Sequence, residues 1–274
     1  MSKEKVILIT GASKGIGKIC ANYLAQQGYR VYGTSRYASM PPKKTSSNTP
    51  ILINMDVNDA TSIEQGLKYI LQKEQRIDVL VNNAGTHIAG SIEETPLEKA
   101  RLQMETNFFG IFQTCKAILP VLRSQQSGHI INISSIMGRI ALPYQGFYSA
   151  SKFAVEGFTE ALRMEVASFG IQACCIQPGD MHLDVAHERW TPPCGESSPY
   201  FDSYFRVMSI VEHDESVGDD PKRIARLIER IIHKSKVKPR YRVGPFIQRF
   251  AAMLKGTAPD RFIEWLLVKV YKVR

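Results

Sequence analysis

The chain has 274 residues, of which 44% are hydrophobic and 22% are charged, and this composition is ordinary for a globular protein. Disordered and collagen-like classes are therefore excluded. Its longest apolar runs, such as 6–9 and 265–268, are far shorter than the roughly 20 residues of a membrane-spanning helix. We expect no transmembrane helix.

The net charge of +9 is concentrated near the C-terminus. Residues 221–274 contain 15 Lys and Arg against 3 acidic residues, a balance of +12, which leaves −3 for residues 1–220. Such a segment is typical of a solvated helical face, and it could instead meet an anionic membrane surface, nucleic acid or an acidic substrate. No nucleic-acid motif occurs in it, so we expect no nucleic-acid partner.

The N-terminal residues, MSKEKVILIT, lack the longer apolar stretch and the cleavage site of a signal peptide. The five cysteines show no CxxC spacing and most lie in apolar segments. We therefore expect a cytoplasmic protein whose thiols are reduced, with a peripheral membrane contact as the alternative.

Short apolar runs alternate with longer segments of helical period up to Gly179. The strands are expected at 5–10, 30–35, 51–55, 79–82, 128–134 and 171–176. The helices are expected at 16–27, 61–75, 97–123 and 148–168. This alternation predicts an α/β fold, with a doubly wound parallel sheet covered by helices on both faces.

The alternation ends after Gly179. Residues 180–216 hold several prolines and aromatic residues and are too irregular for a clear element, so we interpret them as a substrate lid. Helical period resumes at 221–234, and 240–243 is expected to add an edge strand. We expect residues 1–245 to form a single catalytic domain that includes this lid.

Residues 246–274 are expected to form a C-terminal extension of two amphipathic helices, at 246–255 and 260–272. In the second helix, helical spacing puts an apolar stripe between three basic residues. The stripe consists of Phe262, Ile263, Leu266, Leu267 and Val270, and the basic residues are Arg261, Lys269 and Lys272. Packing on the core or across a subunit interface is favoured over contact with a membrane.

A glycine-rich turn joins the first expected strand to the first helix. Glycines at 11, 15 and 17 would let the backbone turn sharply and approach a pyrophosphate, which the free N–H groups of the helix N-terminus would bind. The predicted cofactor contacts in this turn are Gly11, Ser13, Lys14, Gly15, Ile16 and Gly17.

Two cations indicate which dinucleotide this turn binds. A basic residue at the end of the second strand suits the extra phosphate of NADP, where an acidic one would hold the ribose of NAD. Arg36 follows that strand, and Lys14 lies in the turn itself. The sequence therefore predicts NADP(H).

Tyr148 and Lys152 are four residues apart, on one face of a helix. A phenol with a pKa of about 10 needs a nearby cation to act as an acid or base at neutral pH, and Lys152 is placed to provide it. Ser134 and Ser135 lie at the end of the fifth strand, at the sheet edge where doubly wound folds bind ligands. A serine hydroxyl at this place, from either residue, could form a hydrogen bond with a substrate oxygen beside Tyr148.

These motifs, taken in order, resemble the short-chain dehydrogenase/reductase superfamily, in its non-extended branch and on its hydroxysteroid and retinol dehydrogenase side. The resemblance covers the first strand through Pro178 and implies a Rossmann fold and a homodimer or homotetramer. The matching motifs are Thr10 to Gly17, Asp56-Val57, Asn82-Asn83-Ala84-Gly85, Thr106-Asn107, Ser135, Tyr148 to Lys152 and Pro178-Gly179.

The resemblance also implies roles for single residues. Tyr148 would be the general acid and base, Lys152 would hold the nicotinamide ribose, Ser135 would orient the substrate carbonyl and Asn107 would support a proton relay. Further cofactor contacts would be Asp56, Val57, Asn83, Ala84, Gly85, Pro178 and Gly179. Leu183 stands where the family often has a threonine that bonds the nicotinamide carboxamide, which puts that contact in doubt.

The predicted function is NADP(H)-dependent hydride transfer between nicotinamide and a carbonyl or secondary alcohol. Apolar side chains in 180–216 favour a lipophilic steroid-, retinoid- or fatty-type substrate, and His87 could border it. A 3-oxoacyl thioester reductase is the alternative enzyme, and an NADPH-binding sensor or scaffold without turnover is the alternative from another class. No metal site is expected, because His182 and His187 lack a well-spaced third ligand.

Overall fold

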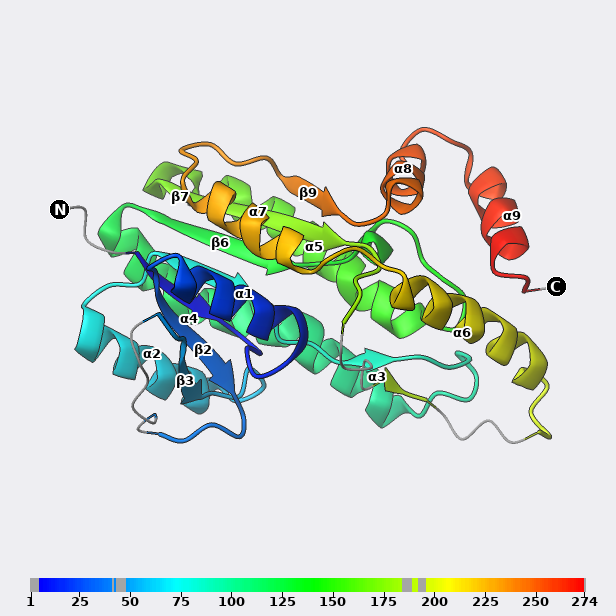
Figure 1. Cartoon of the computed structure of the whole chain (residues 1–274), viewed down its shortest axis with the longest axis horizontal. Helices are drawn as coiled ribbons and strands as arrows, with labels where there is room; N and C mark the ends of the chain where they lie inside the picture. The colour runs from blue at the N-terminus through cyan, green and yellow to red at the C-terminus, as the bar shows by residue number, and fades with distance from the viewer. Residues whose placement is uncertain (1–4, 41, 43–47, 184–188, 192–195, 274) are drawn as a thin grey trace.

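The computed structural model describes residues 5–40, 42, 48–183, 189–191 and 196–273. A seven-stranded parallel sheet forms its centre, in the order β3-β2-β1-β4-β6-β7-β9 (Figure 1). Its strands are β1 (Val6–Ile9), β2 (Arg30–Ser35), β3 (Ile51–Asn54), β4 (Val79–Asn82), β6 (Gly128–Ile133), β7 (Ile171–Pro178) and β9 (Arg240–Val243). The doubly wound parallel sheet predicted from the alternating pattern is confirmed, and so is the edge strand at 240–243.

Helices cover both faces of this sheet. They are α1 (Gly15–Gln26), α2 (Ala60–Glu74), α3 (Leu97–Met104), α4 (Gly110–Gln125), α5 (Gly146–Val166), α6 (Phe201–Ser216), α7 (Lys222–Ile232), α8 (Phe246–Leu254) and α9 (Asp260–Val270). Helices α1 and α7 pack on one face, and α2, α4 and α5 pack on the other. Two short strands outside the main sheet, β5 (His87–Ile88) and β8 (Arg189–Trp190), pair with each other.

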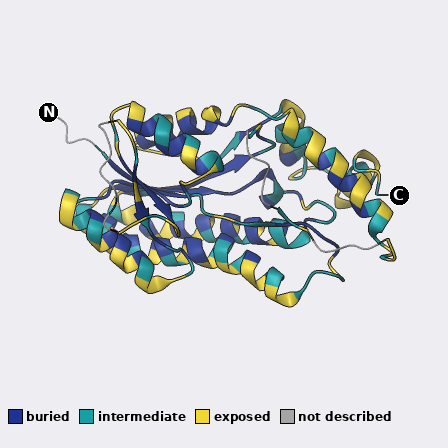
Figure 2. Cartoon of the chain, turned by 60° about the horizontal axis from the view of Figure 1, so that its bottom comes forward, coloured by how far each residue is buried: buried dark blue, intermediate teal, exposed yellow. Residues whose placement is uncertain are grey.

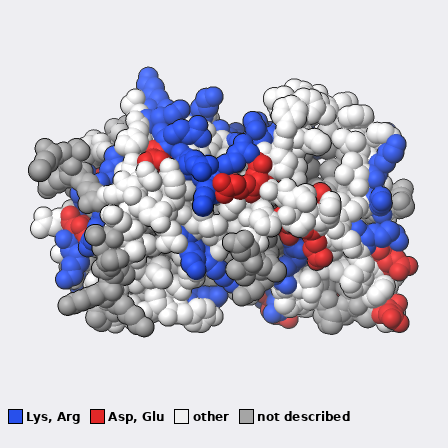
Figure 3. Space-filling model, viewed as in Figure 1, with Lys and Arg blue, Asp and Glu red and all other residues white. Residues whose placement is uncertain are grey.

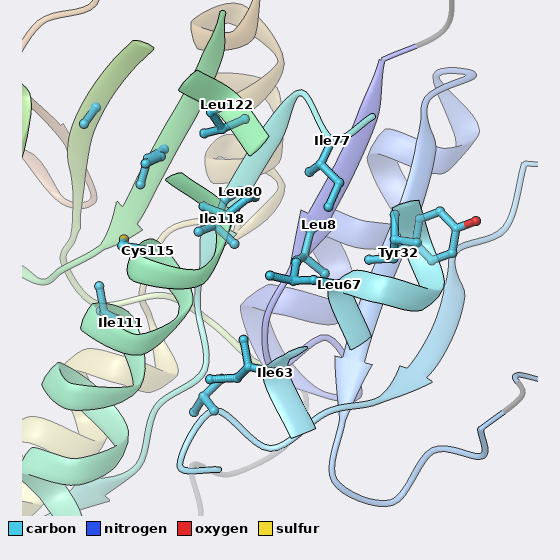
Figure 4. Close-up of a cluster of buried hydrophobic side chains, with 14 of the residues drawn as sticks. Leu8, Tyr32, Ile63, Leu67, Ile77, Leu80, Ile111, Cys115, Ile118 and Leu122 are labelled. Atoms are coloured by element: carbon cyan, nitrogen blue, oxygen red, sulfur yellow. The ribbon is translucent and has the colours of Figure 1, made fainter. Parts of the chain in front are cut away.

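The sheet is buried on both sides, as Figure 2 shows by colour. All residues of β1 and β4 are buried, and such continuous apolar strands are typical of parallel sheets between two helical layers. Figure 4 shows part of the core beneath α2 and α4, where Leu8 and Leu80 of the sheet meet Ile63, Ile111 and Ile118 of the helices. Burial of these apolar side chains holds the helices against the sheet.

A buried polar network ties two of the helices to the centre of the sheet. The Thr114 hydroxyl of α4 donates to Oδ1 of Asn82, at 2.7 Å, and Nδ2 of Asn82 donates to Oδ1 of Asn132, at 2.9 Å. Nδ2 of Asn132 in turn donates to the Thr159 hydroxyl of α5, at 2.8 Å. The network crosses from β4 to β6 and fixes how α4 and α5 are rotated against the strands.

The expectation of an irregular segment over 180–216 is wrong for its last part, where α6 forms. Tyr204, Val207, Met208 and Val211 recur at helical spacing and are buried in a small core of their own. The prolines that suggested an irregular chain all precede this helix. Residues 184–188, which include His187, and 192–195 lie outside the described residues.

The two C-terminal helices form as predicted, but the expected apolar stripe of the second is divided between two faces. Ile263 is buried in α9, and Leu267 packs on a core that includes Ile136 and Ala252. Phe262 and Val270, assigned to the same stripe, are exposed. The reason is that α9 contacts the body through a narrow line of side chains. Among the described residues, no helix combines the length and apolarity needed to cross a membrane.

We predict that Asn132→Leu destabilises the fold. Leucine keeps the volume but removes the bridge between β4 and α5: Nδ2 of Asn82 keeps only the weak acceptor Cys115 Sγ, at 3.3 Å, and the Thr159 hydroxyl keeps only its bond to the Val155 carbonyl, at 2.7 Å. Loss of these buried hydrogen bonds should cost about 1–3 kcal/mol. The loss is measured as the change in free energy of unfolding in urea. The control Asn22→Leu, half-buried on α1 and outside the network, should change it by less than about 0.5 kcal/mol. Equal effects of the two substitutions would contradict the role of the network.

Candidate active site

The candidate site lies along the carboxyl edge of the sheet. The chain passes from β1 to β2 and β3 on one side and then returns to β4 on the other side of β1, so the loops after β1 and β4 diverge. Doubly wound sheets bind ligands in the crevice at such a reversal of strand order. Four predicted motifs follow the strands β1, β4, β6 and β7 at this edge, namely 10–17, 83–85, 134–135 and 178–179.

The glycine-rich turn packs tightly against the loop after β4. Gly11 has a φ of +65°, and a Cβ on it would lie 2.8 Å from Cα of Ala84. A Cβ on Gly17 would lie 2.3 Å from Nδ2 of Asn83, which donates hydrogen bonds to the carbonyls of Thr10 and Gly11, at 3.0 Å each. Only glycine fits these two positions.

The start of α1 fits the pyrophosphate of a dinucleotide. Lys14 occupies the N-cap position without a capping side-chain bond, and the first turn of α1 contains no acidic residue. The first N–H groups of the helix, with the positive end of its dipole, are therefore suited to an anion. Gly15 has a φ of +55°, and its nearest neighbour beyond the turn would be Leu183, at 3.9 Å from an added Cβ. Ser13 and Lys14 are exposed and Ile16 is half-buried at this place.

A cavity of about 80 Å³ lies next to the turn, between β2, β3 and the loop after β4. It brings together six of the predicted cofactor residues, Gly11, Arg36, Asp56, Val57, Ala84 and Gly85. It also includes five residues that the sequence analysis did not assign to the cofactor, Thr34, Ser35, Met55, Asn58 and Thr106. The pairing of Asn58 Nδ2 with the Thr106 hydroxyl, at 3.1 Å, joins segments far apart in the chain, and no spacing rule predicts it.

Asp56 and Arg36 lie at the rim of this cavity. Oδ1 of Asp56 accepts the N–H of Asn58, at 3.0 Å, so the carboxylate also has the structural role of an Asx turn. The Arg36 guanidinium is exposed and lies 5.7 Å from the ring centre of Tyr37. A cation in this position remains free to turn toward a phosphate.

Tyr148 and Lys152 come from the first two turns of α5, where Tyr148 is half-buried and Lys152 is buried. Burial raises the pKa of Tyr148 to about 12, while a hydrogen bond with Ser135 acts in the opposite direction. Burial lowers the pKa of Lys152 to about 8. Nζ of Lys152 lies 5.5 Å from the centre of the Tyr148 ring and donates to the carbonyl of Ile133, at 2.9 Å. The phenol is thus protonated at neutral pH, with a cation beside it.

Ser135 caps the short helix η2 (Ile136–Gly138) directly after β6. Its hydroxyl accepts the N–H of Met137, at 3.0 Å, and lies 3.5 Å from the carbonyl oxygen of Pro178. The Pro178-Gly179 segment is held in place from the other side, because the N–H of Gly179 donates to Val243 of β9, at 2.7 Å. Ser135, Tyr148 and Pro178 therefore meet at one point.

Asn107 lies in a short π-helix, η1 (Glu105–Phe109), between α3 and α4. The helical period of 97–123 predicts one continuous helix, which this π-helix interrupts. Such π-helical segments often occur at functional sites. Oδ1 of Asn107 accepts the N–H of Thr86, at 2.8 Å, and Nδ2 donates to the Thr86 carbonyl, at 3.0 Å, and the Ser151 hydroxyl, at 3.2 Å. The side chain is fully buried and links the loop after β4 to α5.

Tyr148 has further neighbours, of which His87 was expected from the sequence at the border of the substrate, whereas Gln145, Asp180, Arg189 and Glu215 were not assigned to the site. The His87 ring stacks on Tyr148, with ring centres 4.2 Å apart, and its Nε2 lies 2.7 Å from Oε1 of Gln145. Glu215 and Asp180 also act to raise the Tyr148 pKa, and Arg189 acts to lower it. Because Arg189 and Glu215 come from β8 and α6, the fold rather than the local sequence brings them to the site.

The comparisons with known proteins agree with this geometry. The model of the short chain dehydrogenase family matches residues 5–192. A 3-ketodihydrosphingosine reductase of Bacteroides thetaiotaomicron is 42% identical over 273 residues, which are 99% of this chain and 100% of that protein. A probable short-chain type dehydrogenase/reductase of Helicobacter pylori, VdlC, is 33% identical over 90% of each chain.

Two solved structures are similar as well. A short-chain dehydrogenase from Streptomyces avermitilis superposes with a TM-score of 0.81 at 28% identity, over 98% of each chain. ElxO, whose structure has NADP bound, superposes with a TM-score of 0.61 at 34% identity, over 66% of this chain and 75% of that one. With the family model matching most of the chain, this protein belongs to the short-chain dehydrogenase/reductase family of oxidoreductases.

Proposed function

We propose that this chain is an NADPH-dependent reductase of a ketone on a lipophilic molecule. The observation that carries the proposal is the pairing of the half-buried Tyr148 with the buried Lys152 at the carboxyl edge of the sheet, with Tyr148 hydrogen-bonded to Ser135. Such a group can deliver a proton to a carbonyl oxygen in a site that is shielded from water.

The chain's own residues supply binding and proton transfer. Gly11 to Gly17 hold the pyrophosphate, and bound NADPH supplies the hydride. Ser135 and Tyr148 donate hydrogen bonds to the substrate oxygen, and the Tyr148 hydroxyl gives up its proton as negative charge develops there. Lys152 stabilises the resulting phenolate, and Asn107 keeps the adjacent backbone in place. In ketone reduction the tyrosine must start protonated, and the raised pKa of Tyr148 meets this requirement.

The substrate class is supported by similarity and by the local charge. The Bacteroides thetaiotaomicron relative is named as a reductase of 3-ketodihydrosphingosine, a long-chain lipid ketone that carries an amine. Of the two carboxylates that act on Tyr148, Glu215 is paired with Arg189, whereas no ion pair joins Asp180 to a base within the described residues. An amino group on the substrate would pair with Asp180, so a long-chain amino ketone is favoured over the alternative 3-oxoacyl thioester.

We propose that the protein forms a homo-oligomer and resides in the cytoplasm. Phe109 and Phe112 near α4, with Phe153 and Met164 of α5, are exposed and would be covered in a homodimer or homotetramer formed through these helices. Cys20, Cys115, Cys174 and Cys175 are buried free thiols, which suits the reducing cytoplasm.

A ketone panel tests the reaction. With NADPH, we expect the fastest cofactor oxidation with 3-ketodihydrosphingosine, less with a steroid ketone and least with a 3-oxoacyl thioester. Tyr148→Phe should lower kcat by about 10²- to 10⁴-fold while leaving the Kd for NADPH close to that of the wild type. The control Tyr69→Phe, on α2, should be fully active. Fastest turnover of the thioester would favour the alternative enzyme, and NADPH binding without any turnover would favour a sensor or scaffold.

Arg36→Asp should exchange the cofactor preference. A lost charge-assisted hydrogen bond to a phosphate costs about 1.5–3 kcal/mol, so the Kd for NADPH should rise by about 10- to 100-fold while NADH binds no worse. Fluorescence titration of the two reduced cofactors measures this change. The control is Lys73→Asp, which makes the same change of charge at an exposed residue of α2, away from the cavity. An unchanged ratio of the two affinities would remove Arg36 from the cofactor site.

Lys152→Met should stabilise the empty protein near neutral pH. Burial lowers the pKa of Lys152 to about 8, whereas in the unfolded chain the lysine keeps its usual pKa of 10.5. Below pH 8 the folded wild type must therefore hold a buried charge, which destabilises it by roughly 3 kcal/mol at most. As pH rises from 8 toward 10.5, the wild type gains stability and its difference from the variant should narrow. Urea unfolding at several pH values measures this, with the exposed Lys68→Met as control. A difference that does not depend on pH would contradict a buried charged lysine.

A further inference from the structure

A cavity lined by arginines lies outside the candidate active site, between α7, β9 and α8. It has a volume of about 290 Å³, and its charged lining consists of Arg223, Arg226, Arg230, Arg242 and Arg249. Figure 3 shows the resulting group of basic side chains over α7 and β9. Five guanidinium groups from three elements point to an anionic ligand.

The carboxylates near this cavity do not balance its charge. Arg223 pairs with Asp219, and Arg226 lies 3.8 Å from Asp220, but no ion pair joins Arg230, Arg242 or Arg249 to an acid within the described chain. Nε of Arg242 is buried and has no hydrogen-bond partner among the described residues. Burial and the neighbouring Arg139, Arg240 and Arg249 all lower the Arg242 pKa. An anion here would reduce the repulsion between the arginines and accept a hydrogen bond from Nε of Arg242.

Apolar side chains are exposed right beside the cavity. Phe246 and Ile247 of α8 are 74% and 79% exposed, and Phe250 and Met253 continue the same face at helical spacing. Arg249, which lines the cavity, lies on the same helix at the edge of this face. Figure 3 shows the basic group and a largely uncharged lobe over α8 next to each other on one side of the molecule.

Helix α9 extends this surface with aromatic and basic residues. Trp265 is 55% exposed and stacks with the exposed Phe262 at 6.0 Å, and Nζ of Lys269 lies 5.3 Å from the Trp265 ring. The inner sides of α8 and α9 are anchored through the buried Ala252 and Ile263, so packing on the body does not cover the outer sides. Exposed aromatic side chains among basic ones are typical of helices that lie in a membrane interface.

We propose that α8, α9 and the arginine-lined cavity form a surface that docks onto an anionic phospholipid bilayer. Only this partner offers phosphates for the cavity and hydrocarbon for Phe246, Ile247, Phe250 and Trp265 in adjacent layers. A soluble anion leaves the apolar face exposed. A second copy of the chain, joined through the same face, brings one strongly basic surface against another.

The docking surface borders the candidate active site. Oε1 of Gln248, on the inner side of α8, accepts the N–H of Asp180, at 2.9 Å, next to the Pro178-Gly179 segment. Leu267 of α9 packs on the core of Ile136 and Ile140, just after Ser135. A ketone dissolved in the bilayer would therefore be close to the residues that act on it. The docking itself does not depend on the proposed reaction.

Vesicle co-sedimentation of the full chain tests the proposal. At low ionic strength we expect the protein to sediment with phosphatidylcholine/phosphatidylglycerol vesicles, and about tenfold less with phosphatidylcholine alone. The double variant Arg226→Glu/Arg230→Glu should lose this preference, whereas Lys68→Glu/Lys73→Glu, on α2, should keep it. Phe250→Ser/Trp265→Ser should reduce sedimentation with both vesicles, and Leu97→Ser, an exposed apolar residue of α3, should not.

Three results would overturn the proposal. They are no sedimentation of the wild type with either vesicle, an anionic preference that survives the charge reversal, and a concentration-dependent dimer that Phe250→Ser/Trp265→Ser dissolves while vesicle binding is absent. The last result would assign the face to a second copy. None of these measurements depends on turnover. A protein that sediments with vesicles but reduces no ketone would support docking and contradict the proposed reaction. A protein that reduces a ketone but does not sediment would support the reaction and contradict docking.

Discussion

The hydrogen-bonded row of Thr114, Asn82, Asn132 and Thr159 is the constraint on which the site depends. Thr159 lies eleven residues after Tyr148 on α5, which is close to three helical turns, so both side chains face the sheet. Fixing Thr159 to Asn132 therefore also fixes the direction in which Tyr148 and Lys152 point. On α4 the same row fixes the helix that follows the π-helical Asn107.

The site is built at a cost to stability. An ammonium and an asparagine are buried, and a phenol is half-buried, where apolar side chains would fold more easily. Burial raises the pKa of Tyr148 and lowers that of Lys152, because it disfavours the charged form of each. A bound dinucleotide and substrate would compensate for this burial. Burial also disfavours the charged form of Arg242, in the arginine-lined cavity between α7, β9 and α8, where an anion would compensate in the same way.

The local sequence was sufficient to predict the strands of the sheet and the glycines that close backbone packing requires. The strands are short apolar runs bounded by turns, and Gly11 and Gly17 are required by close backbone contacts, so both leave a clear pattern. Tyr148 and Lys152 could be paired because one helix carries them. Helix α6 was missed because prolines precede it, although Tyr204, Val207 and Val211 carried its period. Neither the Asn58–Thr106 contact nor the arginine-lined cavity could be predicted, because segments distant in sequence form them.

We infer that the glycine-rich turn and Tyr148 serve one and the same nicotinamide cofactor. The most direct test is a crystal structure of the protein with NADPH. We predict the pyrophosphate at Gly15 to Gly17 and the nicotinamide ring between the Tyr148 hydroxyl and the Pro178-Gly179 segment. A dinucleotide bound elsewhere, or a Tyr148 hydroxyl that points away from the ring, would contradict the account.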